Sequence, residues 1–196
     1  MVRAILDGRK SCTRRINKDA NDYAVPDMDF FDPEKRTYAV HNYADKEHTD
    51  KLSTAERTCP ICPGDILYIR ETWYKDKYRY MYRANYSDSE KFYRDGKEVK
   101  IKWHPSIHMP KEAARIWLKV TDVRVERLQE ITSEQIYKEG VEVEEPHVLN
   151  GEEKRYAFSS LWNSTVKKSD IDRYGWDASP WVWVIEFERC EKPEGV

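Results

Sequence analysis

The sequence predicts an α+β fold built around a small β-barrel, with short helices on the rim of the barrel. Four segments are rich in β-branched and aromatic residues or alternate polar with apolar residues, whereas two or three short segments have helical spacing. The length of 196 residues fits one domain, and 7 Trp, 13 Tyr and 5 Phe can fill its core. We therefore expect residues 1–196 to form a single domain with irregular insertions at about 17–57 and 86–101.

The charges are nearly balanced along the chain. Lysine and arginine number 34 and aspartate and glutamate 36, a net charge of −2. This balance excludes a basic coat for non-specific duplex binding but leaves room for a local basic pocket. No apolar run approaches the roughly 18 residues that span a bilayer, and no signal-peptide pattern follows Met1. Because the 4 cysteines also lack the spacing of a disulfide-rich secreted domain, we expect a soluble cytoplasmic protein with no membrane partner.

The N-terminal part of the chain predicts one short helix followed by loops. Residues 2–7 are mainly apolar, and Gly8 is placed where a helix ends on a left-handed residue. A basic stretch over residues 9–15 follows it. Residues 17–57 are polar and irregular, with two prolines and several Asp and Asn, so we expect a long loop there.

The middle of the chain predicts two strands after a turn at residues 63–65 (PGD). Residues 66–73 form an apolar run, and residues 77–84 alternate basic with aromatic side chains, as in a strand with one solvated face. The charged connection that follows contains a turn signal at Asp95-Gly96, and the proline-rich segment 105–110 predicts a further turn.

The C-terminal part predicts two long strands and two helices. Residues 114–128 form a strand whose alternation slips near Thr121-Asp122, which indicates a β-bulge. Thr132 and Gln135 form a capping box for a helix from Ser133 to about Glu139, ended by Gly140. Residues 156–166 suit a second helix, with Phe158, Leu161 and Trp162 on one face, and residues 181–188 (WVWVIEFE) form the clearest strand.

Three residues suggest nucleophilic and acid–base chemistry. Thr13 is a nucleophile once a base takes its proton, and Lys10 is a base when burial and neighbouring arginines disfavour its charged form. Glu139 ends a helix, where the helix dipole favours a protonated carboxyl group and hence a proton donor. The alternatives are a solvated basic turn for the first two residues and an exposed glutamate at a frayed helix end for the third.

A second group of residues suggests recognition of a nucleobase. Glu71 and Trp73 share one face of the predicted strand, so a carboxylate could bond the edge of a base that stacks on the indole. The alternative is a surface Arg–Glu pair beside a core tryptophan. Together, the candidate ligand-binding residues are Arg15, Arg70, Glu71, Trp73, Trp103 and His104.

Neither a metal nor a cofactor is expected. Cys59 and Cys62 have the spacing of half a zinc site, but no second pair lies near them in the sequence. His104 and His108 are four residues apart, but the prolines around them argue against a helix. The sequence also lacks a glycine-rich phosphate loop and an acidic cluster suited to Mg²⁺.

Residues Gly8, Lys10, Thr13 and Arg15 match the G-x-K-x-x-T-x-R signature of the ASCH domain family, and the chain resembles the long phage and prophage members of that family. Further matching blocks are Pro63–Asp65, Arg70–Trp73, Pro105–Pro110, the strand Val120–Leu128, Ile131–Val141, Tyr174–Asp177 and Pro180–Val184. The resemblance implies a PUA-like β-barrel. It also implies, by analogy with small amidohydrolases of N(4)-acetylcytidine, that Lys10 is the proton acceptor, Thr13 the nucleophile and Glu139 the proton donor.

Two functions follow as expectations. The first is a PUA-like module that binds RNA or a modified nucleoside in a cleft at the mouth of the barrel, and the second is an amidohydrolase that removes an acyl group from an N(4)-acetylcytidine-like nucleoside. A ribonuclease is a weaker alternative, because the sequence lacks an acidic cluster. In each case we expect Lys10, Arg15 and Glu71 to line one pocket.

Overall fold

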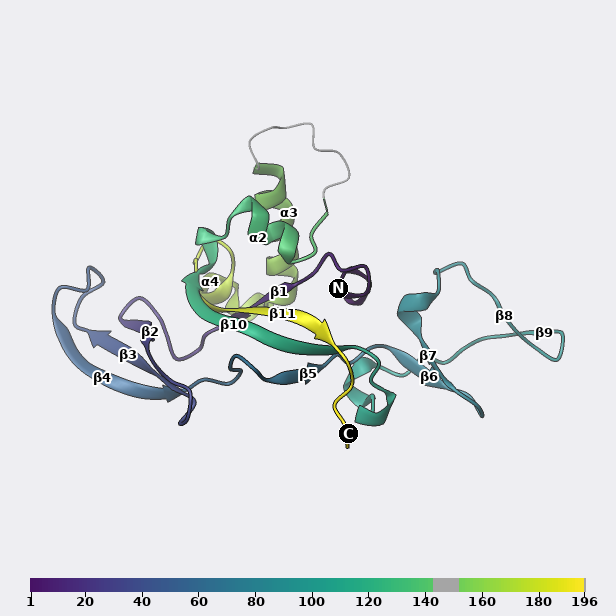
Figure 1. Ribbon diagram of the computed structural model, residues 1–196. Helices are drawn as coiled ribbons and strands as arrows, with labels where there is room; N and C mark the ends of the chain where they lie inside the picture. The colour runs from purple at the N-terminus through teal and green to yellow at the C-terminus, as the bar shows by residue number, and fades with distance from the viewer. Residues whose placement is uncertain (143–151, 196) are drawn as a thin grey trace.

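The computed structural model describes residues 1–142 and 152–195, which fold around a strongly curved antiparallel sheet (Figure 1). Its strand order is β1 (Cys12–Ile16), β11 (Trp181–Cys190), β10 (Trp117–Arg127) and β5 (Ile66–Tyr68). The two long strands β10 and β11 form the curve, and β1 and β5 are the outer strands of this sheet. The predicted mixed, strand-rich fold with short helices is therefore confirmed, and the sheet has the shape of a half-barrel.

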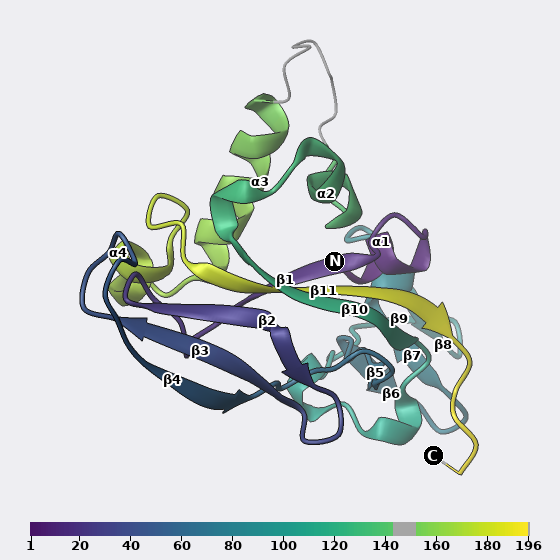
Figure 2. The ribbon, with the colours of Figure 1, turned by 60° about the vertical axis from the view of Figure 1, so that its left-hand side comes forward.

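Strand β11 is buried on both faces, which explains its unbroken run of apolar residues. Val182 and Val184 pack with residues of the helices, whereas Trp183 and Ile185 pack with Tyr38 and its neighbours on the other side. Figure 2 shows helices α2 (Ser133–Lys138) and α3 (Glu152–Thr165) on one side of the long strands, and the sheet of β2 (Ala24–Asp32), β3 (Thr37–Tyr43) and β4 (Lys51–Thr58) on the other. The predicted bulge in β10 is confirmed, because its register against β11 shifts between Val120 and Asp122.

The predicted helix boundaries follow from local signals. Helix α1 (Val2–Leu6) is followed by Gly8 at φ +74°, and helix α2 (Ser133–Lys138) by Gly140 at φ +79°. Thr132 and Gln135 form the predicted capping box. Helix α3 (Glu152–Thr165) begins four residues before the predicted start.

The remaining helical segments are α4 (Ile171–Tyr174) and the 3₁₀ turns η1 (Arg83–Asn85), η2 (Ser106–His108), η3 (Lys111–Ala113), η4 (Leu128–Glu130) and η5 (Lys168–Asp170). Among the described residues, none of these helices has the length and apolar character needed to cross a membrane.

The long loop predicted over residues 17–57 is wrong. This segment forms a three-stranded antiparallel sheet of β2 (Ala24–Asp32), β3 (Thr37–Tyr43) and β4 (Lys51–Thr58). Two of the aspartates that suggested a loop, Asp32 and Asp45, hold the turns between these strands. The Asp32 carboxylate accepts hydrogen bonds from two backbone N–H groups of one turn, and the Asp45 carboxylate does the same in the next.

The strands predicted at residues 66–73 and 77–84 are shorter than expected, and the chain between them turns. Strand β5 ends at Tyr68, and β6 (Trp73–Lys75) pairs instead with β7 (Tyr80–Tyr82). Asp76 accepts hydrogen bonds from the backbone of Tyr78 and Arg79, so the first residues of the predicted second strand form the hairpin turn.

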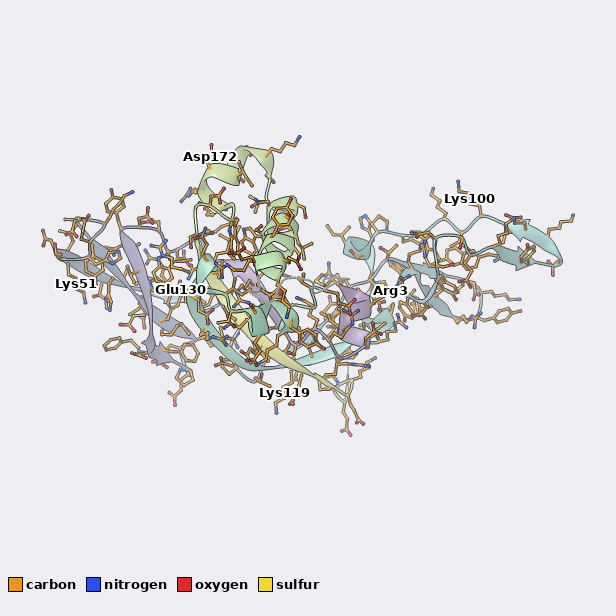
Figure 3. The ribbon with its side chains drawn as sticks, turned by 90° about the horizontal axis from the view of Figure 1, so that it is seen from above. Arg3, Lys51, Lys100, Lys119, Glu130 and Asp172 are labelled. Atoms are coloured by element: carbon orange, nitrogen blue, oxygen red, sulfur yellow. The ribbon has the colours of Figure 1, made fainter. Side chains whose placement is uncertain are left out.

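The predicted insertion at 86–101 contains a second hairpin, β8 (Phe92–Arg94) and β9 (Lys97–Val99). Its turn lies at Asp95-Gly96, as predicted, and both turn residues have positive φ. We call residues 73–104 the aromatic lobe. The Arg3 guanidinium of α1 joins this lobe to the rest of the fold by donating to the carbonyls of Ala84 and Tyr86 at 2.9 and 2.8 Å. Figure 3 shows Lys51 of β4 and Lys100 of the lobe at opposite ends of the molecule, with Arg3 between them.

Candidate ligand-binding cleft

A cleft of about 530 Å³ lies between β1, the end of α2 and one side of α3. Four residues predicted from sequence line it, namely Lys10, Thr13, Arg15 and Glu139. Its volume falls within the range of small-molecule sites, about 300–1,000 Å³. Lys10 belongs to the basic stretch, and Glu139 lies at the end of the capping-box helix. These two residues are 129 positions apart in the sequence and meet at the cleft.

Two glycine-ended helices bring Lys10 to Glu139. The chain turns at Gly8 after α1 and at Gly140 after α2, and residues 10 and 139 then form an antiparallel bridge. A Cβ on Gly140 would lie 2.8 Å from Ala4 Cβ and 3.0 Å from Lys10 Cβ, so this close approach requires glycine.

Lys10 and Glu139 form a buried ion pair. Lys10 Nζ lies 2.6 Å from Glu139 Oε2 and donates a second hydrogen bond, at 2.8 Å, to the Glu139 carbonyl at the end of α2. The Lys10 and Glu139 side chains are only 5% and 8% exposed. Both hydrogen bonds of Lys10 Nζ therefore go to Glu139, one to its carboxylate and one to its carbonyl.

Arg14 extends this pair into a network. Its Nη1 lies 3.4 Å from Glu139 Oε1, and its Nη2 lies 3.2 Å from Glu126 Oε2. Glu126 also pairs with Arg124, which reaches Glu186 on β11. The Arg14 side chain is 1% exposed, and its Nε has no hydrogen-bond partner among the described residues. The network therefore gives the buried Lys10, Arg14 and Glu139 partners of opposite charge.

The Cys12 thiol is buried, and charges of this network contribute to the shift of its pKa. Burial raises the pKa of the Cys12 thiol to about 11, and the negative charge of Glu139 acts in the same direction. Arg14 and Lys10 oppose this effect without overcoming it. Cys12 is therefore held as an unreactive thiol beneath the cleft.

Thr13 and Arg15 lie on the opposite face of β1 from Arg14, because side chains alternate along a strand. Arg15 Nη1 donates to Thr13 Oγ1 at 2.9 Å and to the Arg14 carbonyl at 2.8 Å. Arg15 is exposed, and it forms no ion pair with a carboxylate of residues 1–142 and 152–195. It is the cation of the cleft that remains available to a ligand.

Helix α3 supplies an apolar wall that was not predicted as part of the site. Phe158 and Trp162 are buried and line the cleft from below, but Leu161 lines it with 52% of its surface exposed. The helical spacing of these residues predicted a shared face, yet the same pattern is typical of a purely structural helix. The cleft thus combines a charged side on β1 and α2 with an apolar side on α3.

Glu71 does not line this cleft, so the predicted common pocket of Lys10, Arg15 and Glu71 is wrong. Its side chain is 1% exposed and accepts two hydrogen bonds of 2.8 Å from Arg115. Strand β5, which precedes Glu71, is at the opposite edge of the sheet from β1, which carries Arg15. The adjacent Arg70 donates to the Ile107 carbonyl and the Tyr68 hydroxyl instead.

The predicted aromatic ligand-binding residues gather in the aromatic lobe. The rings of Trp73 and His104 lie 4.9 Å apart, and their backbones bond each other. Trp103 contacts Tyr86 and Phe92, with ring centroids 5.9 and 6.0 Å apart. The structure therefore brings these residues together with one another but not with Lys10 and Thr13.

Cys59 and Cys62 are both buried, and their thiols donate to backbone carbonyls at 2.9 and 3.8 Å. Burial raises the pKa of the Cys59 thiol to about 12. Within the two described stretches of the chain, no group of three or more His, Cys, Asp or Glu side chains could hold a metal ion.

Comparison of the chain with protein-family models, with curated protein sequences and with solved structures found no match.

Proposed function

We propose that the cleft binds RNA or a modified nucleoside, with an anionic or carbonyl group of the ligand on Arg15. The observation that carries this proposal is the exposed Arg15 guanidinium, which lacks a carboxylate partner among the described residues and lies beside the Thr13 hydroxyl. A guanidinium and a hydroxyl side by side are donors that suit a phosphate or a carbonyl oxygen.

The charge and the apolar wall of the cleft favour the same class of ligand. Lys10 and Arg14 are paired with Glu139 and Glu126, so Arg15 supplies the positive charge that the cleft offers, in a chain whose net charge is −2. Leu161 of α3 and Ile16, which follows Arg15 on β1, offer apolar surface against which a planar base can lie. We also propose that the chain belongs to the ASCH family, which it resembles. The curved sheet would then have a PUA-like arrangement.

Binding is tested by calorimetric titration of the full chain with cytidine 5′-monophosphate and with a short single-stranded RNA. We expect saturable binding that Arg15→Ala weakens by about 10- to 150-fold, the equivalent of a charge-assisted hydrogen bond of about 1.5–3 kcal/mol. Arg57→Ala is the matched control, because Arg57 is an exposed arginine of β4 that also lacks an ion pair among the described residues. Equal losses in the two variants, or no saturable binding by the wild type, would refute the proposal.

A second candidate function is removal of an acyl group from an N(4)-acetylcytidine-like nucleoside, because Lys10, Thr13 and Glu139 line the same cleft. Transfer of the shared proton from Lys10 to Glu139, across 2.6 Å, produces a neutral amine and a protonated carboxyl group together. The amine can then accept the Thr13 proton, and the carboxyl group can protonate the departing amine.

Turnover of N(4)-acetylcytidine distinguishes the two functions. An amidohydrolase loses turnover in Thr13→Val and in Lys10→Met, and because the two groups act as a unit the double variant loses little more than either single one. Thr13→Ser, which keeps the hydroxyl, should retain measurable turnover. A wild-type chain that binds the nucleoside without releasing acetate has the binding function alone.

A further inference from the structure

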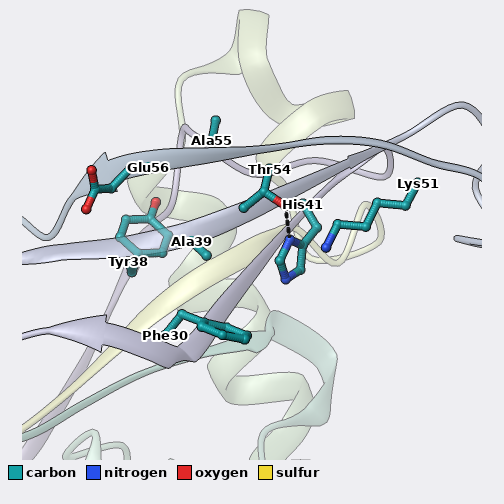
Figure 4. Close-up of a pocket in the computed structure, with 8 residues that line it drawn as sticks. All are labelled: Phe30, Tyr38, Ala39, His41, Lys51, Thr54, Ala55 and Glu56. Carbon is teal, nitrogen blue, oxygen red and sulfur yellow. Dashed lines mark hydrogen bonds between the residues drawn. The ribbon is translucent and has the colours of Figure 1, made fainter.

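The β2–β4 sheet carries a second cavity, of about 440 Å³, on the face drawn in Figure 4. Phe30, His41, Lys51 and Thr54 line it, from all three strands. None of these residues lines the cleft beside β1. The cavity is therefore a separate feature of the molecule.

Three side chains on neighbouring strands form a continuous hydrogen-bond chain at this cavity. His41 on β3 lies opposite Thr54 on β4, with His41 Nδ1 2.9 Å from Thr54 Oγ1. On the other side, His41 Nε2 lies 3.0 Å from Asp27 Oδ2 on β2. Asp27 is itself oriented, because its Oδ1 accepts a hydrogen bond from the Asp29 backbone at 3.0 Å.

The chain of hydrogen bonds selects the tautomer of the histidine. A carboxylate only accepts hydrogen bonds, so Nε2 of His41 carries the hydrogen that bonds to Asp27. In the neutral ring Nδ1 is then an acceptor, and the hydrogen on Thr54 Oγ1 points toward it. This order of nucleophile, base and orienting carboxylate is that of a Ser-His-Asp triad, with the two ring nitrogens exchanged.

The surroundings complete a reactive site. His41 and Asp27 have side chains that are 13% and 27% exposed, whereas Thr54 is exposed to the cavity. Lys51 pairs with no carboxylate among the described residues, so its charge can stabilise a negative oxygen. Phe30 is 67% exposed and offers an apolar wall, its ring 6.1 Å from that of His41.

We propose that Thr54, with His41 as base and Asp27 as positioning residue, is an acyl-transfer nucleophile for small carboxylic esters. Thr54 Oγ1 attacks the ester carbonyl and gives its proton to His41 Nδ1. The ester C–O bond breaks, and the departing alkoxide takes that proton as an alcohol. Water then attacks the acyl-Thr54 ester and passes one proton through Nδ1 back to Thr54 Oγ1, which releases the carboxylic acid.

The probe is p-nitrophenyl acetate with the full chain, followed by release of p-nitrophenolate and by peptide mass spectrometry of the acetylated residue. We expect an acetyl group on the hydroxyl at position 54 in the wild type and in Thr54→Ser, and none at this position in Thr54→Val. His41→Ala should slow acetylation of Thr54 on the order of 10²-fold or more, the contribution of a general base. Asp27→Asn should slow it as well, and Asp27→Glu should restore part of the rate.

Thr58→Val is the matched control, because Thr58 is an exposed threonine of the same strand outside the cavity. It should leave acetylation of Thr54 unchanged, and circular dichroism checks that each variant is folded. Acetyl found only on lysines in the wild type overturns the proposal, as does an equal rate at Thr54 in the wild type and in His41→Ala.

Discussion

The buried charges beneath the β1 cleft make stability sensitive to Glu139. In Glu139→Gln the residue loses its charge, and Lys10 is left as a cation that is 5% exposed with no carboxylate on it. Removal of one partner of a buried ion pair costs about 3–5 kcal/mol. Because Glu139 compensates both Lys10 and Arg14, we expect this substitution to lower the free energy of unfolding by that amount.

Substitution of Lys10, the other partner of the pair, should lower the free energy of unfolding by a smaller amount. In Lys10→Met the Glu139 carboxylate keeps Arg14 Nη1 at 3.4 Å, so a buried acceptor loses one partner, at about 1–3 kcal/mol. In the double variant Arg14 keeps Glu126 at 3.2 Å, and no unpaired charge remains. The double variant should therefore be more stable than the sum of the two single losses predicts, by about 0.5–3 kcal/mol.

Urea unfolding followed by circular dichroism measures these differences, provided that the dependence of the free energy on urea is unchanged. For a chain of this size the Glu139→Gln loss corresponds to a melting temperature lower by about 6–20 °C. The control is Glu191→Gln, because Glu191 is exposed and forms no ion pair among the described residues. A Glu139→Gln chain within about 0.5 kcal/mol of the wild type, or strictly additive losses in the double variant, would refute the reasoning.

Three further predictions concern the glycines and thiols around the same site. Gly140→Ala should destabilise the fold by about 1–3 kcal/mol more than Gly8→Ala in urea unfolding, because both residues have positive φ but only a Cβ at 140 meets other atoms; equal losses would contradict the close contact. Iodoacetamide should modify Cys190, which is partly exposed, before the buried Cys12, as mass spectrometry of a time course will show. The raised pKa of the Cys12 thiol means that its contribution to stability is complete below about pH 9 and is lost as pH rises toward 11, so Cys12→Ala should flatten the alkaline decline of the unfolding free energy.

Several elements could be predicted because their signals act over a few residues. The turn at Gly8, the capping box of Thr132 and Gln135, and the turn at Asp95-Gly96 depend only on local backbone conformation and local hydrogen bonds. The run of residues 181–188 likewise identified a buried strand, since no solvent-facing side interrupts its apolar residues.

The β2–β4 sheet was not predicted, because its strands lack such local signals. Its strands carry many polar residues, and its register depends on pairing between segments that give no strong local signal. Asp27, His41 and Thr54 lie on three different strands, so their hydrogen-bond chain exists only once that register is set. The one sequence signal for this sheet was the presence of aspartates at turn positions. Because the whole segment is polar, these aspartates were interpreted as part of a long loop.

By itself the sequence determined the local pieces of this protein and the basic stretch that carries Lys10, Thr13 and Arg15. Only the tertiary structure decided which distant residues join that stretch. It placed the Glu139 carboxylate 2.6 Å from Lys10 Nζ, and it placed Glu71 against Arg115 instead. The physical reason is the order of strands in the curved sheet, where β1 and β5 are at opposite edges, because strand order depends on long-range pairing and on burial of both faces of β11.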